Sequence, residues 1–152
     1  MGPRRSLGTA RPSLIHTGGR YTTRDALFGT WRLRSMESVD AEGQVSHPMG
    51  RDASGYLMYA PDGYMSVAIV GAHRPAFGSP DMRAGTSEEK DAAFDTYIAY
   101  CGTYEVRDNA VVHQVQASLF PNWEGGQQER LIKREGRHLR LSTRPMPMNG
   151  VV

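Results

Sequence analysis

The sequence contains a single cysteine, Cys101. An internal disulfide is therefore excluded, and cysteine usage gives no indication of an oxidising compartment. The chain also has no run of about 18 or more apolar residues, which a membrane-spanning helix would need. Its N-terminus lacks the apolar core of a secretory signal. We therefore expect a cytoplasmic protein that does not enter a membrane.

Sequence motifs for metal, phosphate and nucleophile chemistry are also missing. The five histidines are scattered and show neither His-x-His nor His-x-x-x-His spacing, so we expect no metal site. There is no glycine-rich phosphate loop, no dinucleotide fingerprint and no serine in a nucleophile-elbow motif. We expect a protein that works without a cofactor.

Positive and negative charges are nearly balanced in the sequence. The formal net charge is +2, so no strong field draws the protein towards nucleic acid or anionic lipid. Five arginines nevertheless precede the first acidic residue, Asp25. We expect residues 1–24 to be a flexible basic leader. Residues 25–152 are then long enough to fold as one domain without disulfides.

Seven short segments of the chain have strand character. The clearest two, 55–60 and 64–70, are aromatic and β-branched and are joined by Pro61-Asp62-Gly63. Proline fixes φ in such a turn and glycine accepts a positive φ, so this pair predicts a hairpin. The other segments are 31–39, 103–107, 110–119, 127–134 and 138–143.

One helix is expected between the strands. Thr86 and Glu89 have the spacing of a capping box, with Thr86 as the N-cap. The helix is predicted to run to Gly102 and to lie over one barrel opening or against the barrel wall. Its apolar stripe would bury Cys101 as a small core residue. The members of this stripe are Ala93, Phe94, Tyr97, Ile98 and Cys101.

Short strands, turns between them and one helix predict an all-β fold, an antiparallel up-and-down meander that closes into a small barrel. Closure removes sheet edges, which would otherwise promote aggregation. A sandwich would need longer crossovers than this chain offers. The expected barrel has seven to eight strands.

Several segments in order carry a family resemblance. They are Leu27-Phe28-Gly29-Thr30-Trp31-Arg32-Leu33, the segments 62–66 and 99–106, the more specific segment 113–123 (HQVQASLFPNW), and 139–143. Together, from about Leu27 to Pro147, they resemble the lipocalin-like domain family. The resemblance implies a calycin-type barrel that holds a small organic molecule in its interior.

The end of the chain departs from this family, whose members usually finish with one more strand. The resemblance also implies that Trp31 packs under an arginine of the last strand, and the sequence does not identify that arginine. Three explanations stay open. The barrel has seven strands, the leader fills the gap through residues 14–17, or a second chain fills it in a homodimer.

His113 is the first candidate for chemistry. Alternation along 110–119 places it on the apolar face, which should point into the lumen. A neutral imidazole there can bind a ligand or shuttle a proton. The alternative is a histidine that is hydrogen-bonded to a neighbouring strand and fixes its register. Its face comprises Val111, His113, Val115, Ala117 and Leu119.

Arg130 is the second candidate. It shares a face of 127–134 with Gln128, but each face of this segment holds one aliphatic residue, so its orientation is ambiguous. Facing inward, Arg130 can hold a carboxylate, enolate or phenolate oxygen. Facing outward, it would pair with Glu129 or Glu105.

Aromatic side chains supply further candidates. Tyr104 is expected to border the lumen, where it can contribute to catalysis or simply pack in the core. Tyrosines combine apolar area with one hydrogen-bonding end, which suits aromatic ligands. The expected ligand contacts are Tyr59, Tyr64, Val115, Trp123 and Gln128.

Two functions follow. The first is a binding module for a small, largely apolar or aromatic molecule. The alternative, which the resemblance implies, is a cofactor-independent isomerase or cyclase of secondary metabolism. In that enzyme His113 would act as acid or base, while Arg130 or Tyr104 would stabilise negative charge. The sequence does not separate the two.

Overall fold

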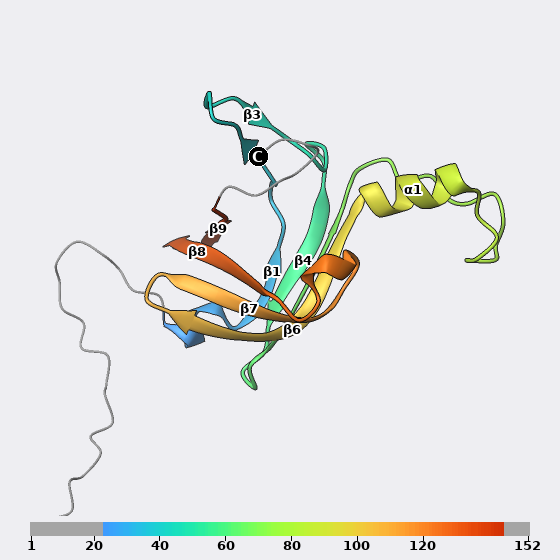
Figure 1. The fold of residues 1–152 in the computed structure, drawn as a ribbon. Helices are drawn as coiled ribbons and strands as arrows, with labels where there is room; N and C mark the ends of the chain where they lie inside the picture. Colours follow the sequence, from blue (N-terminus) through green and yellow to red (C-terminus); the bar gives the residue numbers. More distant parts are fainter. Residues whose placement is uncertain (1–22, 145–152) are drawn as a thin grey trace, which may run out of the picture.

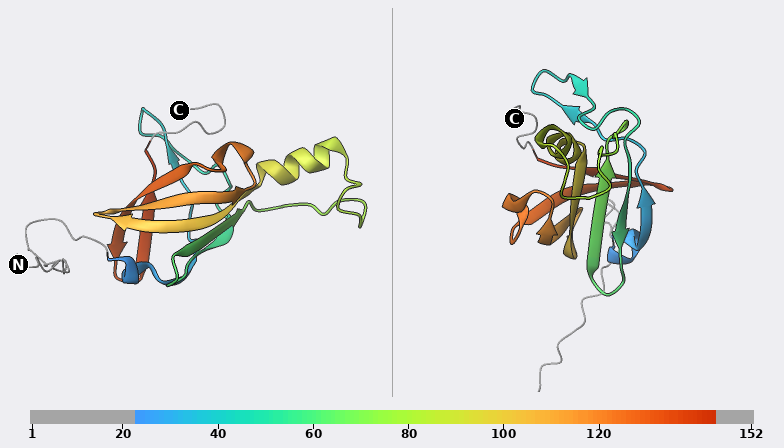
Figure 2. Two further views of the ribbon diagram at one scale, coloured as in Figure 1. Left: turned by 60° about the horizontal axis from the view of Figure 1, so that its bottom comes forward. Right: turned by 90° about the vertical axis from the view of Figure 1, so that its right-hand side faces the viewer.

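The computed structural model of the chain describes residues 23–144 (Figure 1). Seven antiparallel strands form one sheet in the order β1-β4-β5-β6-β7-β8-β9, and the sheet curls into a nearly closed barrel (Figure 2). The predicted all-β antiparallel barrel is therefore confirmed. The strands are β1 (Gly29–Arg32), β4 (Ser54–Tyr59), β5 (Tyr64–Val70), β6 (Tyr97–Arg107), β7 (Ala110–Ser118), β8 (Gln127–Glu135) and β9 (His138–Ser142).

The chain leaves this sheet after its first strand. A separate two-stranded sheet follows, formed by β2 (Ser38–Val39) and β3 (Val45–Ser46). The carboxylate of Asp40 accepts hydrogen bonds from the backbone N–H groups of Glu42 and Gln44 and so holds the turn between them. The prediction of one continuous strand over 31–39 is wrong, because the chain divides this segment between two sheets.

The predicted hairpin is confirmed as β4 and β5. Its turn is closed by a hydrogen bond from the Ala60 backbone N–H to the Tyr64 carbonyl. Gly63 has a φ of 96°, the positive value that the Pro-Asp-Gly sequence predicts. The Asp62 carboxylate accepts a hydrogen bond from the Tyr64 N–H.

The capping box of the helix α1 (Ser87–Asp95) is also confirmed. The Thr86 hydroxyl accepts a hydrogen bond from the Glu89 N–H, and the Glu89 carboxylate accepts one from the Thr86 N–H. Hydrogen bonds from the backbone of Gly78 and Thr86 lower the pKa of Glu89. The helix projects away from the barrel and none of its residues is buried (Figures 1 and 2). The prediction that this helix lies over a barrel opening or against the barrel wall is therefore wrong.

The helix also ends earlier than predicted. It stops at Asp95, and β6 begins two residues later, so Cys101 lies exposed on a strand. The apolar residues of 93–101 fit both a helical and an alternating period. Because β6 pairs with β5 and β7 along its length, its side chains follow the alternating period of a strand. Ile98, Tyr100 and Tyr104 therefore point inward.

A β-bulge changes the faces of β7. Gly102 pairs with Val115 and Cys101 pairs with Ala117, which leaves Gln116 as the extra residue. The predicted inward face is correct for His113 and Val115. It is wrong for Ala117, which the bulge turns outward and leaves exposed.

One end of the barrel is closed by the 3₁₀ helix η1 (Arg24–Leu27), whose Leu27 is fully buried. The Trp31 indole N–H donates a hydrogen bond to the Leu27 carbonyl. The Arg134 guanidinium lies 5.5 Å from the centre of the Trp31 ring and donates a hydrogen bond to the Ala26 carbonyl. Arg134 is thus the arginine over Trp31, but it lies on β8 and not, as the resemblance implies, on the last strand, β9.

The two edge strands, β1 and β9, each have one sheet neighbour among residues 23–144. The barrel is open between these two edge strands. The hydrogen bond from Arg134 to Ala26 links β8 to η1 across this open side. Residues 14–17, and all of the predicted leader except Thr23 and Arg24, lie outside the described residues, so the explanations for the gap stay predictions. Within the described part of the chain, no helix is long and apolar enough to cross a membrane.

The bulge gives a direct test of the fold. A Cβ atom at Gly102 would lie 1.8 Å from the Gln114 carbonyl oxygen, so alanine there must displace backbone. We expect Gly102→Ala to lower the free energy of unfolding by at least about 2 kcal/mol in urea denaturation. Gly78→Ala, where the nearest atom lies 3.6 Å away, is the control and should change it by no more than about 0.5 kcal/mol. Equal stabilities would contradict the assigned pairing.

Candidate ligand site

A histidine joins two tyrosines inside the barrel. The Tyr59 hydroxyl lies 2.7 Å from Nε2 of His113, and the Tyr100 hydroxyl lies 2.8 Å from Nδ1. Tyr59 is on β4 and His113 on β7, with β5 and β6 between them in the sheet. The first contact therefore crosses the barrel interior. All three side chains are buried, His113 and Tyr59 to 1% exposure.

The protonation of this cluster follows from its charges. Burial and the positive charge of Arg130 lower the pKa of His113 to about 3, so the imidazole is neutral near pH 7. Burial raises the pKa of both Tyr59 and Tyr100, so both phenols keep their protons. The Tyr59–His113–Tyr100 cluster is therefore uncharged.

A neutral imidazole donates at one nitrogen and accepts at the other. The positive charge of Arg130 opposes part of the rise in the pKa of Tyr100. Because the imidazole is neutral, one tyrosine hydroxyl donates to the bare ring nitrogen of His113, and the other accepts a hydrogen bond from its ring N–H. Both ring nitrogens are thus occupied within the cluster.

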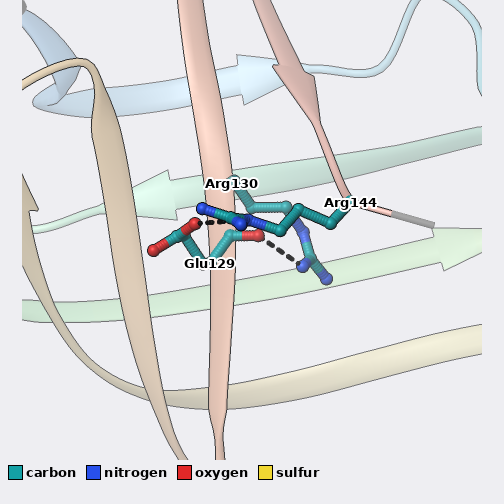
Figure 3. A network of polar contacts seen from close by, with 3 residues as sticks. All are labelled: Glu129, Arg130 and Arg144. Carbon is teal, nitrogen blue, oxygen red and sulfur yellow. Dashed lines mark hydrogen bonds and ion pairs between the residues drawn. The ribbon is translucent and has the colours of Figure 1, made fainter. Parts of the chain in front are cut away.

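Arg130 faces the interior, and this settles its ambiguous orientation. It pairs with the fully buried Val111, and Gln128 pairs with His113. The guanidinium donates to the Gln128 side-chain oxygen at 3.0 Å and to the Glu129 carbonyl at 3.0 Å. Figure 3 shows the side chains of Arg130 and Glu129 leaving β8 on opposite sides.

The outward alternative for Arg130 is wrong, because both proposed acidic partners bind other arginines. The Glu129 carboxylate pairs with Arg144 at 3.2 Å (Figure 3), and the Glu105 carboxylate pairs with Arg107. Among residues 23–144, no carboxylate forms an ion pair with Arg130. Arg130 is half-buried and brings a positive charge to an otherwise neutral interior.

Tyr104 lies near the cluster but its hydroxyl has a structural partner. It donates to the Ala60 carbonyl at 2.9 Å, which ties β6 to the β4–β5 turn. Its ring lies 4.7 Å from that of Tyr59, and the Arg24 guanidinium lies 5.3 Å from its centre. Tyr104 thus belongs to the closed end of the barrel.

The structure brings together most of the expected ligand contacts. Val115 is buried on the same face as His113, and Trp123, in the 3₁₀ helix η2 (Pro121–Trp123), stands edge-on to Tyr100 at 5.7 Å. Tyr64 does not join them, because it lies on the outer face of β5 and is 54% exposed. Its neighbour Met65 takes the inward position.

Sequence reasoning missed two parts of the site. The predicted helix includes Tyr100 near its end. Only the alternating period of 98–106 indicates that Tyr100 lies on a strand and points inward. The second part is an apolar inner wall whose side chains pack against the core and yet stay half-buried. Its members are Trp31, Leu57, Ile69, Leu139 and Leu141.

The neutral His113 predicts how stability depends on pH. Its pKa is lower in the folded chain than in the unfolded chain, where it is about 6.5, so its contribution is present above pH 6.5 and is lost as the pH falls towards 3. We expect a loss of about 2 kcal/mol between pH 7 and pH 5 from this residue.

The variant His113→Gln cannot titrate but keeps a donor and an acceptor. Urea denaturation should give it a weaker pH dependence than the unmodified protein over this range. His138→Gln, on the exposed end of β9, is the matched control for the loss of one histidine. An unaltered dependence in His113→Gln would show that His113 has the same pKa in the folded and unfolded chain, and would contradict the neutral, buried imidazole.

Comparison with known proteins supports this reading of the barrel. A family model described as a lipocalin-like domain matches residues 28–150. A 4'-hydroxy-3'-methoxypropiophenone carrier protein from Aspergillus oryzae is 34% identical over 96 residues, which cover 57% of this chain and 86% of that protein. No solved structure gives a significant match. The sequence motifs, the nearly closed barrel and the family match agree, and the chain belongs to the lipocalin-like domain family.

Proposed function

We propose that this barrel is a carrier of a small aromatic ketone with a phenolic group, which it binds and releases unchanged. The observation that supports this most is the inner apolar wall, where inward side chains stay half-buried. In a barrel of this size, the interior is either filled by side chains or holds one small ligand. The name of the Aspergillus oryzae relative, a carrier of a hydroxymethoxypropiophenone, supplies the ligand class.

The wall and the polar groups have separate parts in this proposal. Leu57, Ile69 and Leu141 offer apolar contacts to an aromatic ring, and each apolar Å² removed from water contributes roughly 25 cal/mol. Arg130 and Gln128 lie at one side of the interior and fix the orientation of the ligand's oxygens.

The alternative, an isomerase or cyclase with His113 as acid or base, receives less support. A base whose pKa lies near 3 is a poor proton acceptor at neutral pH, where the ideal pKa lies near the working pH. Both ring nitrogens of His113 also bind tyrosine hydroxyls, so neither is free to reach a substrate. Tyr104 has its hydroxyl on Ala60. These contacts suit an interior that holds a ligand without reacting with it.

Calorimetric titration with 4'-hydroxy-3'-methoxypropiophenone tests the proposal. We expect saturable binding at one ligand per chain, and recovery of the ligand unchanged after long incubation. Leu57→Phe places extra volume on the inner wall and should weaken binding by tenfold or more, about 1.4 kcal/mol.

The control is Met58→Phe, which adds volume on the outer face of the same strand, where Met58 is 46% exposed. It should leave the affinity within about twofold, roughly 0.4 kcal/mol. Equal weakening by both variants would place the ligand outside the barrel. Chemical conversion of the ligand by the unmodified protein would instead favour the enzyme.

A further inference from the structure

The charge balance of the barrel interior points to the form in which the ligand binds. Arg130 projects from the inner face of β8, beside Val111 of β7, and is half-buried. Its charge is felt by Tyr59, Tyr100 and His113, all of which respond to it in their pKa. The guanidinium donates a hydrogen bond to Gln128, which pairs with His113, so it lies beside the polar part of the interior.

Among residues 23–144, no anionic group faces Arg130 from the elements packed around it. The titratable groups on that side are Tyr59 of β4, Tyr100 of β6 and His113 of β7, and all three are neutral near pH 7. On its own strand, the inward neighbour Gln128 is uncharged, and Glu129 points outward to Arg144. Within residues 23–144, Arg130 is thus an unpaired cation.

The hydrogen bonds of Arg130 leave it free to bind more. It donates to the Gln128 side chain and to the Glu129 carbonyl, while a guanidinium has more N–H donors than these two bonds use. A buried charge without a partner is costly, and an anionic oxygen on a ligand removes that cost. Charge-assisted hydrogen bonds are also about twice as strong as neutral ones.

We infer that the site binds its phenolic ligand as the phenolate, with the anionic oxygen at Arg130. This inference rests on the proposed function. The ligand's hydroxyl proton passes to bulk solvent on binding, because the interior has no base to take it. The aromatic ring then lies along the apolar wall, and the ketone points away from Arg130.

Two probes that differ by one methyl group test the inference. The first is 4'-hydroxy-3'-methoxypropiophenone, and the second is 3',4'-dimethoxypropiophenone, which cannot ionise. Phenolate and phenol absorb at different wavelengths, so absorbance reports the ionisation of the first probe when it is bound. We expect its pKa to fall by one unit or more on the protein, which corresponds to about tenfold tighter binding of the phenolate than of the phenol.

Calorimetry in buffers of different ionisation enthalpy should also show release of a proton below the pKa of the free probe. The methyl ether should bind at least about fivefold more weakly than the phenol at a pH where the free phenol is half ionised, because only half of the free phenol is then in the tighter-binding form.

Three variants separate local from general effects of charge. Arg130→Gln should abolish the fall in the probe's pKa, and Arg130→Lys should restore part of it. Arg140→Gln removes the same charge from an exposed position on β9, next to Lys133 of β8, and should leave the fall unchanged.

The possible failures are distinguishable. If both probes bind equally and the phenol stays neutral, the ketone or the ring fixes the ligand, and the inference is wrong while the carrier proposal stands. If the fall in pKa persists in Arg130→Gln, the anionic oxygen lies elsewhere and the inference is again wrong. If neither probe binds, the carrier proposal fails for this ligand class, and the inference fails with it.

Discussion

The bridge that His113 makes between Tyr59 and Tyr100 determines the character of the barrel interior. Because each ring nitrogen has a tyrosine hydroxyl as its partner, three polar side chains can be buried together without a charge. The bridge also joins β4, β6 and β7 across the lumen, so it fixes how the curled sheet closes on itself. A neutral cluster at the centre leaves Arg130 as the group that sets the polarity of the space beside it.

This arrangement separates the two ends of the barrel. Around Leu27, the contacts of Arg134 with Trp31 and Ala26 and the hydrogen bond of Tyr104 to Ala60 make a closed end that is occupied by protein groups. Arg130 and the half-buried inward side chains of Leu57 and Ile69 take no part in these contacts. The proposal of binding without reaction rests on the bridge, since both ring nitrogens of His113, the candidate acid or base, already bind tyrosine hydroxyls.

The sequence predicts local features whose signals come from adjacent residues. The Pro-Asp-Gly turn, the capping box at Thr86 and the inward direction of His113 all follow from short-range chemistry. The helix end and the faces of β7 do not, because 93–101 fits two periods and the bulge at Gly102 arises only when β6 meets β7. Tyr100 and the stacking of Arg134 on Trp31 depend on strand register between distant segments. Tyr64 does not point inward for a related reason, because its neighbour Met65 takes the inward position on β5.

The central claim is that His113 is a neutral bridge, and nuclear magnetic resonance of protein with ¹⁵N-labelled histidine tests it most directly. Between pH 8 and pH 5, we expect the His113 ring to keep one protonated and one bare nitrogen, with unchanged shifts. A His113 ring that gains its second proton near pH 6.5 would contradict the account, because the barrel interior would then hold two positive charges and His113 could serve as an acid.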